Sequence, residues 1–148
     1  MLRWQTIAVC AIAALVFELG QVSPSAADRQ EFIVIVQRSN PITAVDQEFL
    51  RAVFLRKAVR WSSGEAIRPI DLPKGVVARE RFTRDVLGKT PAQLRNFWVQ
   101  RIFSGTDVPP PEATSTAAAV AYVLANRGAV TYVPAGSDIG DAKVITIR

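Results

Sequence analysis

The chain alternates between short β-branched runs and longer segments in which apolar residues recur every three or four positions. Phe32 to Val36 is a continuous apolar run, which predicts a buried strand. Similar runs predict three further strands, at residues 66–72, 129–133 and 143–147. Pro69 has no backbone N–H, so it weakens the ladder of the second strand or places it near a sheet edge.

Two helices are predicted in the first half of the chain. Asp46 can cap the first, whose apolar face is formed by Phe49, Leu50, Val53 and Phe54. The second follows Gly75, and its inner face is formed by Ala78, Phe82 and Val86. On its outer side, opposite charges at helical spacing predict two ion pairs, Glu80 with Arg84 and Arg81 with Asp85.

Two more helices are predicted before the last pair of strands. Thr90, Pro91 and Gln93 form a capping-box start, and the periodic face of that helix is Leu94, Phe97, Trp98, Arg101 and Ile102. Pro109-Pro110-Pro111 is a stiff extended connector. Ser115 or Thr116 then caps an Ala-rich helix, whose predicted inner face is Ala117, Val120, Ala121 and Leu124.

Strands that alternate with helices indicate an α/β domain. We expect an open, mainly parallel or mixed sheet of about four strands with helices on both faces. Residues 28–148 suffice for one domain with a real hydrophobic core.

The first 27 residues have the pattern of a secretory signal peptide. Arg3 precedes an apolar run from Ile7 to Leu19, and small residues lead to a predicted cleavage site after Ala27. An uncleaved anchor is the alternative, although the run is shorter than the roughly 20 residues that span a membrane. We therefore expect residues 28–148 to be periplasmic or otherwise extracytoplasmic, with no transmembrane span after cleavage.

The composition narrows the function. The chain has no histidine and its one cysteine, Cys10, lies in the apolar run, so the usual metal ligands and the usual neutral-pH base are missing. Serine and threonine residues have no histidine partner and no nucleophile elbow, so we predict no enzyme, no metal and no cofactor. The net charge of +5 suits an oxyanion, an anionic membrane or a wall polymer, and a solvated basic surface is the alternative. Export argues against nucleic acid.

The strand-to-helix junction at residues 72–79 is the first candidate site. A helix N-terminus offers free backbone N–H groups and a partial positive charge, and Gly75 lets the backbone approach an anion closely. The junction predicts a weak oxyanion site formed by Lys74, Gly75, Val76, Val77, Ala78 and Arg79. An ordinary connection with solvated bases is the alternative.

A second candidate lies after the first strand. Ligands of open α/β sheets gather at the carboxyl ends of strands. There Arg38 could hold an oxyanion, with hydrogen bonds from Ser39 and Asn40. The alternative is an exposed turn at Asn40-Pro41.

In their order along the chain, these segments resemble the phosphate-binding proteins of ABC transporters, which are type 2 periplasmic binding proteins. The likeness runs from Phe32 to the C-terminus. Its motifs are Ser39-Asn40-Pro41, the helix from Phe49 to Lys57 that ends near Trp61, the Gly75 loop followed by Arg79 and Phe82, and Gly128-Ala129-Val130-Thr131-Tyr132-Val133. The last is similar to the family's Gly-Ala-Ile-Gly-Tyr-Val strand. The resemblance implies one lobe of that fold and a solute-binding role.

Two features depart from this family. Its members close two lobes on the ligand, and residues 28–148 suffice for about one. The family's Ser, Gly and Thr that hold phosphate fall on Val76, Val77 and Ala78, and its Arg falls on Leu72. Valine side chains give no hydrogen bonds to compensate an oxyanion for its lost hydration.

Two functions therefore remain open. The first is an exported solute-binding domain of the phosphate ABC transporter type that binds phosphate or another oxyanion weakly. The second is a non-catalytic interaction module that keeps the fold and binds another envelope protein or a second copy of itself.

Overall fold

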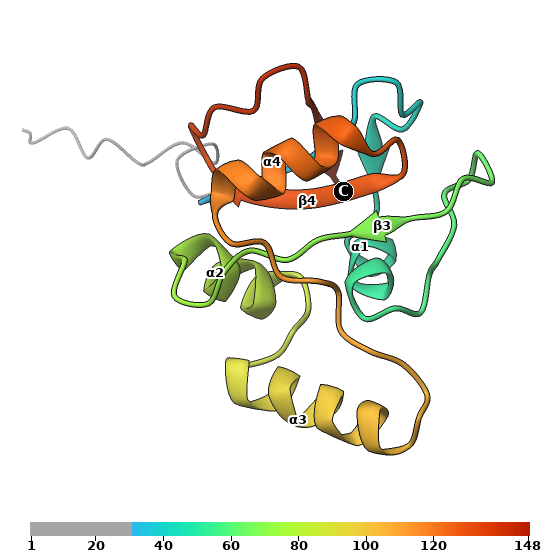
Figure 1. Ribbon diagram of the computed structural model, residues 1–148, viewed down its shortest axis with the longest axis vertical. Helices are drawn as coiled ribbons and strands as arrows, with labels where there is room; N and C mark the ends of the chain where they lie inside the picture. Colours follow the sequence, from blue (N-terminus) through green and yellow to red (C-terminus); the bar gives the residue numbers. More distant parts are fainter. Residues whose placement is uncertain (1–30) are drawn as a thin grey trace, which may run out of the picture.

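The computed structural model describes residues 31–148, and the predicted signal peptide lies outside these residues. Five strands and four helices follow one another along the chain (Figure 1). Their order is β1 (Phe32–Val36), β2 (Ala44–Val45), α1 (Gln47–Phe54), β3 (Arg68–Pro69), α2 (Val77–Asp85), α3 (Pro91–Phe103), α4 (Thr116–Ala125), β4 (Ala129–Pro134) and β5 (Lys143–Ile147).

The strands form one mixed sheet in the order β2-β5-β1-β4-β3. The central strand β1 is antiparallel to both of its neighbours, β4 and β5, whereas the outer pairs β3–β4 and β2–β5 are parallel. Of the two predicted forms of the sheet, the mixed one is therefore observed. The unpredicted two-residue strand β2 raises the strand number to five, and Pro69 lies in the edge strand β3.

Helices cover both faces of the sheet, as predicted. Figure 1 shows α4 over one face and α1 and α2 over the other, with α3 as the outermost element on that side. Residues of β1 alternate between the two layers: Phe32, Val34 and Val36 join the larger core cluster, whereas Ile35 joins the smaller cluster with α4. Both clusters consist of described residues, so residues 31–148 contain a hydrophobic core of their own. Within this range no helix is long and apolar enough to cross a membrane.

The predicted helix starts agree with the structure at α3 and α4. Thr90 and Gln93 form the reciprocal capping box of α3, and the Ser115 side chain accepts a hydrogen bond from the Ala118 N–H at the start of α4. Asp46 holds the cap position of α1, although its side chain accepts no hydrogen bond there. These caps depend on neighbours in sequence, which is why the pattern predicts them well.

Predictions about helix surfaces were wrong on α3, α4 and α2. Ile102 of the predicted face of α3 is 52% exposed, whereas Leu94 and Trp98 of that face are buried. Val120 of the predicted inner face of α4 is buried, but its other buried residues are Ala119 and Val123, and Leu124 is exposed. A helix made largely of alanine has no distinctive apolar stripe, so its rotation is set by the sheet it covers. On α2, Arg81 pairs with Glu31 at 2.8 Å instead of with Asp85, because the start of β1 lies beside that helix.

Candidate functional site

The predicted oxyanion junction lies on an exposed loop between β3 and α2. Gly75 has a φ of +87°, a conformation that only glycine adopts without strain, and no other group lies within 4 Å of the place where a Cβ would be. Lys74 and Val77 are exposed, whereas Ala78 is buried against the core. The Gly75 loop and Val77 at the start of α2 are therefore accessible to solvent.

Arg79 does not point into this solvent-exposed space but is held inside the protein. Its guanidinium lies 3.0 Å from Asp71 Oδ2 and 2.7 Å from Glu112 Oε2. It also donates a hydrogen bond of 2.6 Å to the carbonyl oxygen of Leu72. Only 17% of the Arg79 side chain is exposed, so these partners use most of its hydrogen-bonding capacity.

Glu112 reaches Arg79 because the connector before α4 extends the sheet. Asp71 and Glu112 form a parallel bridge, in which the Asp71 N–H donates to the Pro111 carbonyl and the Ala113 N–H donates to the Asp71 carbonyl. The Glu112 carboxylate then accepts from the Lys74 N–H at 3.4 Å as well as from Arg79. The sequence identified only a stiff proline connector here, and 33 residues separate Glu112 from Arg79, so no local pattern could have shown this contact.

Asp71 is the buried centre of this cluster. It accepts hydrogen bonds from the Tyr132 hydroxyl and, at 2.9 Å, from the Leu72 N–H. Tyr132 in turn stacks on Phe82 of α2 with ring centroids 3.8 Å apart. Burial raises the pKa of the Asp71 carboxyl, against the opposing effect of the Arg79 guanidinium. Burial also raises the pKa of the Tyr132 hydroxyl, which is protonated and donates to Asp71.

The charges of this cluster do not favour an added anion. Asp71 and Glu112 supply two negative charges, and Arg79 and Lys74 supply two positive charges. An oxyanion that approached Arg79 would meet the Glu112 carboxylate, which already occupies one side of the guanidinium. Two like charges about 4 Å apart repel by roughly 4 kcal/mol at an effective dielectric constant of about 20.

The second candidate pair, Arg38 and Ser39, lies at the opposite end of the sheet. Because β1 runs antiparallel to β4, Val36 at the end of β1 faces Val130 near the start of β4. β3 runs parallel to β4, so the loop after β3 leaves from the other end. The structure therefore does not bring Arg38 and Ser39 together with residues 74–79.

At that end, Arg38 is engaged only weakly. It lies 3.7 Å from Asp141, with both side chains mostly exposed, and such pairs contribute little to stability. The Ser39 N–H and hydroxyl both donate to the Gln37 side chain. Gln37, Arg38, Leu124, Gly140 and Asp141 line an open hollow of about 580 Å³.

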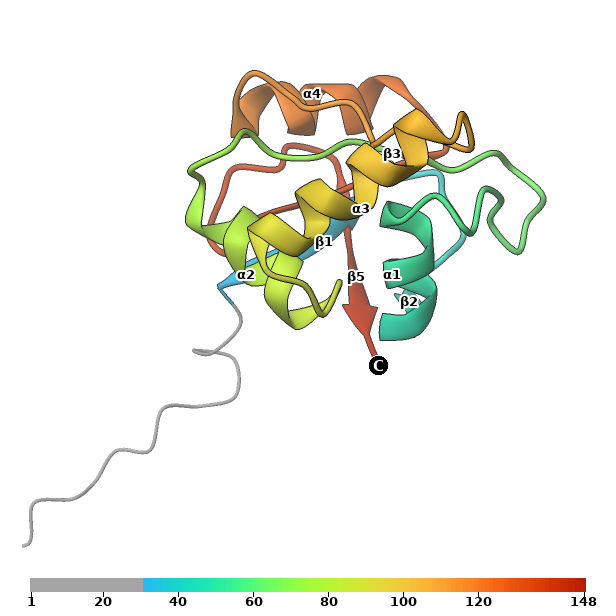
Figure 2. The same ribbon diagram turned by 90° about the horizontal axis from the view of Figure 1, so that it is seen from below.

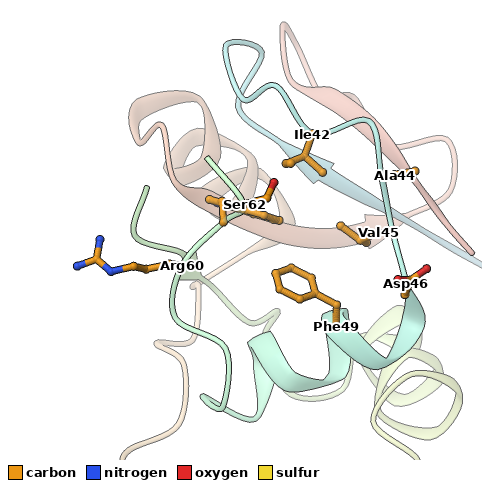
Figure 3. Close-up of a pocket in the computed structure, with 8 residues that line it drawn as sticks. Ile42, Ala44, Val45, Asp46, Phe49, Arg60 and Ser62 are labelled. Carbon is orange, nitrogen blue, oxygen red and sulfur yellow. The ribbon is translucent and has the colours of Figure 1, made fainter. Parts of the chain in front are cut away.

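Another hollow, of about 340 Å³, lies between β2, the start of α1 and the loop at Trp61. Figure 3 shows the Phe49 ring inside it and the Arg60 side chain pointing away. The Arg60 guanidinium donates instead to the Gly64 carbonyl at 2.9 Å. Trp61 is buried, and its ring N–H donates to the Gly128 carbonyl at 3.1 Å, so it anchors the loop to the core. The floor of this hollow is apolar and does not suit an oxyanion.

The Arg79–Glu112 contact predicts a pH dependence of stability. The hydrogen bond from Arg79 holds the pKa of Glu112 below its ordinary 4.5. A lowered folded-state pKa contributes stability above the unfolded value, and this contribution is lost as pH falls through the folded value. Urea unfolding should therefore show that Glu112→Gln lowers the free energy of unfolding at neutral pH and that its deficit shrinks below about pH 4.5.

Glu80→Gln is the matched control, because Glu80 is exposed on α2 next to Arg79 and makes none of these contacts. A deficit of Glu112→Gln that stayed constant from neutral pH to pH 3 would contradict the ionic role of Glu112. The contribution of Asp71 to stability changes with pH in the opposite direction, because its raised pKa favours the folded state at low pH.

Comparisons with known proteins give a fold relationship only. No family model matches the sequence, and no curated protein matches it significantly. Solved structures do match: an ABC-type phosphate transport receptor from Vibrio cholerae has a TM-score of 0.63 at 18% identity, over 79% of this chain and 46% of its own. PstS from Borrelia burgdorferi has a TM-score of 0.61 at 11% identity, over 80% of this chain and 47% of its own.

A Clostridium perfringens protein described as a phosphate ABC transporter substrate-binding protein, with bound phosphate, also has a TM-score of 0.61. Its identity is 13%, and the match covers 79% of this chain and 44% of that protein. The chain thus spans less than half the length of each of these structures. Its fold is similar to part of each of these structures.

Proposed function

We propose that this chain is a phosphate-binding-protein-like lobe that acts as a non-catalytic protein-interaction module in the cell envelope. The observation that carries the proposal is the Arg79 guanidinium, which is held between the carboxylates of Asp71 and Glu112. The side chain best placed to grip an oxyanion is already neutralised from within the protein. Its partner would be another exported protein or a second copy.

The neighbouring side chains support this proposal. The side chains of Val76 and Val77 carry no hydrogen-bond donor, so a dehydrated oxyanion would depend on backbone N–H groups and the exposed Lys74 ammonium. The loop is exposed, which leaves bulk water in competition for those groups. The other predicted donors are Arg38 and Ser39. They lie at the end of the sheet opposite the Gly75 loop.

Weak oxyanion binding at Lys74, Gly75, Val76, Val77, Ala78 and Arg79 is the second candidate function. One observation favours it: Lys74 and Val77 are exposed on either side of the open Gly75 loop. Under this alternative the backbone N–H groups and the Lys74 ammonium replace the missing side-chain donors.

Titration calorimetry of residues 28–148 with inorganic phosphate at low salt, with sulfate as control, separates the two functions. We expect no saturable heat from the wild type with either anion. Glu112→Gln removes the competing carboxylate and should raise any phosphate affinity at the junction about tenfold or more, because one adjacent negative charge is lost. Saturable wild-type heat with phosphate alone, abolished by Lys74→Glu, would establish the second function instead.

Sedimentation tests the interaction proposal directly. The mass of residues 28–148 at rising concentration shows whether a second copy is the partner. A monomer at all concentrations would exclude self-association, and phosphate-specific heat together with that result would overturn the proposed module.

A further inference from the structure

Helix α3 is apolar on two opposite faces. Its inner face buries Leu94 and Trp98 in the core. Its outer face carries Val99 and Phe103, and Phe103 is 89% exposed. Ile102 continues the stripe of Leu94 and Trp98 at the end of the helix, where it is 52% exposed. A helix with apolar residues on both sides is normally covered on both sides, and in the described structure only the inner face is covered.

The charge around this outer face has one sign. Residues 86–106 contain three bases, Lys89, Arg95 and Arg101, and no acidic residue. The next carboxylate, Asp107, lies 3.6 Å from Arg56 and is only 22% exposed. That ion pair also brings the exposed Val108 next to the end of α1, where Lys57 is exposed. Of the three bases in residues 86–106 only Arg95 is exposed, whereas Lys89 and Arg101 lie over the Phe97 ring, 5.3 and 5.1 Å from its centroid. The outer face of α3 is therefore apolar, with the exposed Arg95 beside it and no carboxylate within residues 86–106.

The shape of the molecule leaves this face accessible. Figure 1 shows α3 on the far side of α2 from the sheet, at the end of the molecule opposite α4. In the view from below, α3 passes in front of the sheet between α1 and α2 (Figure 2). A protruding helix can contact a flat surface along its length.

We propose that the outer face of α3 docks on an anionic lipid surface. An exposed Phe and neighbouring aliphatic side chains enter the boundary between headgroups and acyl chains. Lys and Arg beside them gain roughly 1 kcal/mol each near an anionic leaflet, and this attraction weakens with salt. The inference is independent of the proposed function, because α3 carries none of the residues of the oxyanion junction.

Vesicle co-sedimentation tests this docking. The protein is residues 28–148, because the apolar run at residues 7–19 would itself enter lipid. The vesicles contain either phosphatidylcholine alone or equal parts of phosphatidylcholine and phosphatidylglycerol. We expect binding to the anionic vesicles at low salt, weaker binding at physiological salt, and none to the neutral vesicles.

Variants of α3 locate the contact. Phe103→Ser should lower the partition coefficient about tenfold, because a large apolar side chain no longer enters the lipid. Arg95→Glu should lower it about thirtyfold, because two units of charge are reversed near the surface. Both side chains are exposed, so circular dichroism melting should show intact folding.

Two matched controls lie on other elements. Val144→Ser removes a half-exposed apolar side chain from β5, and Arg127→Glu reverses an exposed charge after α4. Neither substitution should change the partition coefficient on anionic vesicles. Equal losses in control and α3 variants, or no wild-type binding to anionic vesicles, would overturn the proposal. A concentration-dependent rise in mass that Phe103→Ser abolishes, without vesicle binding, would assign the face to a second copy.

Discussion

Replacement of Gly128 by alanine is expected to lower the free energy of unfolding by about 3 kcal/mol or more. A Cβ at this position would lie 1.9 Å from the carbonyl oxygen of Ala66 and 3.1 Å from its carbonyl carbon. These are backbone atoms, which cannot rotate away as a flexible side chain can. Urea unfolding of residues 28–148 at neutral pH measures the loss.

The contacts of Gly128 explain why the backbone cannot simply move apart. Its carbonyl accepts hydrogen bonds from the Arg68 N–H at 2.9 Å and from the Trp61 ring N–H at 3.1 Å. A shift that relieved the clash would weaken the pairing of β3 with β4 and the anchor of the Trp61 loop.

Gly105→Ala is the matched control for Gly128→Ala. Gly105 has a φ of +66°, and no heavy atom lies within 4 Å of the place where a Cβ would be. Alanine there adds backbone strain without a clash and should cost about 1 kcal/mol. If Gly128→Ala lowers the free energy of unfolding no more than Gly105→Ala does, the close approach of Gly128 to Ala66 contributes little to the effect.

The second large effect is expected from Arg79→Met, which should lower the free energy of unfolding by about 3 kcal/mol at pH 7. Methionine keeps much of the apolar stem but removes the cation that compensates Asp71 and Glu112. The side chain of Asp71 is only 16% exposed, so an uncompensated negative charge there is costly.

Arg79→Met should lower the free energy of unfolding less at pH 4 than at pH 7. Without Arg79, burial is less opposed and the pKa of Asp71 rises further, so the folded state takes up a proton as pH falls. Arg127→Met, which removes a mostly exposed base at 4.0 Å from Glu65, should change stability by less than about 1 kcal/mol. An equal loss at both pH values would contradict the electrostatic account of Arg79.

The sequence predicted elements whose signals are local. The capping box of Thr90 and Gln93, the buried strand at Phe32–Val36 and the inner face of α2 at Ala78 and Phe82 are confirmed. The rotation of α4 was predicted wrongly, because alanine contributes similar burial on every side of a helix. The close approach of Gly128 to Ala66 depends on two distant segments, so no local pattern could predict it.

For the candidate site, the sequence correctly placed Lys74 to Arg79 at a strand-to-helix junction with an open Gly75 loop. It could not show what the Arg79 side chain contacts. Glu112 follows three prolines whose composition indicates only an extended connector, and its pairing with Asp71 arises from the sheet edge.

By itself, then, the sequence determined the α/β class, the positions of the helices and most of the buried positions, because periodicity and capping depend on residues a few positions apart. The tertiary structure alone decided the direction of β1, and with it the separation of Arg38 and Ser39 from the Gly75 loop. It also decided that Arg79 is neutralised by Asp71 and Glu112 and that the outer face of α3 is uncovered. Strand direction and charge pairing are set by contacts between residues that are far apart in the chain, which no local pattern records.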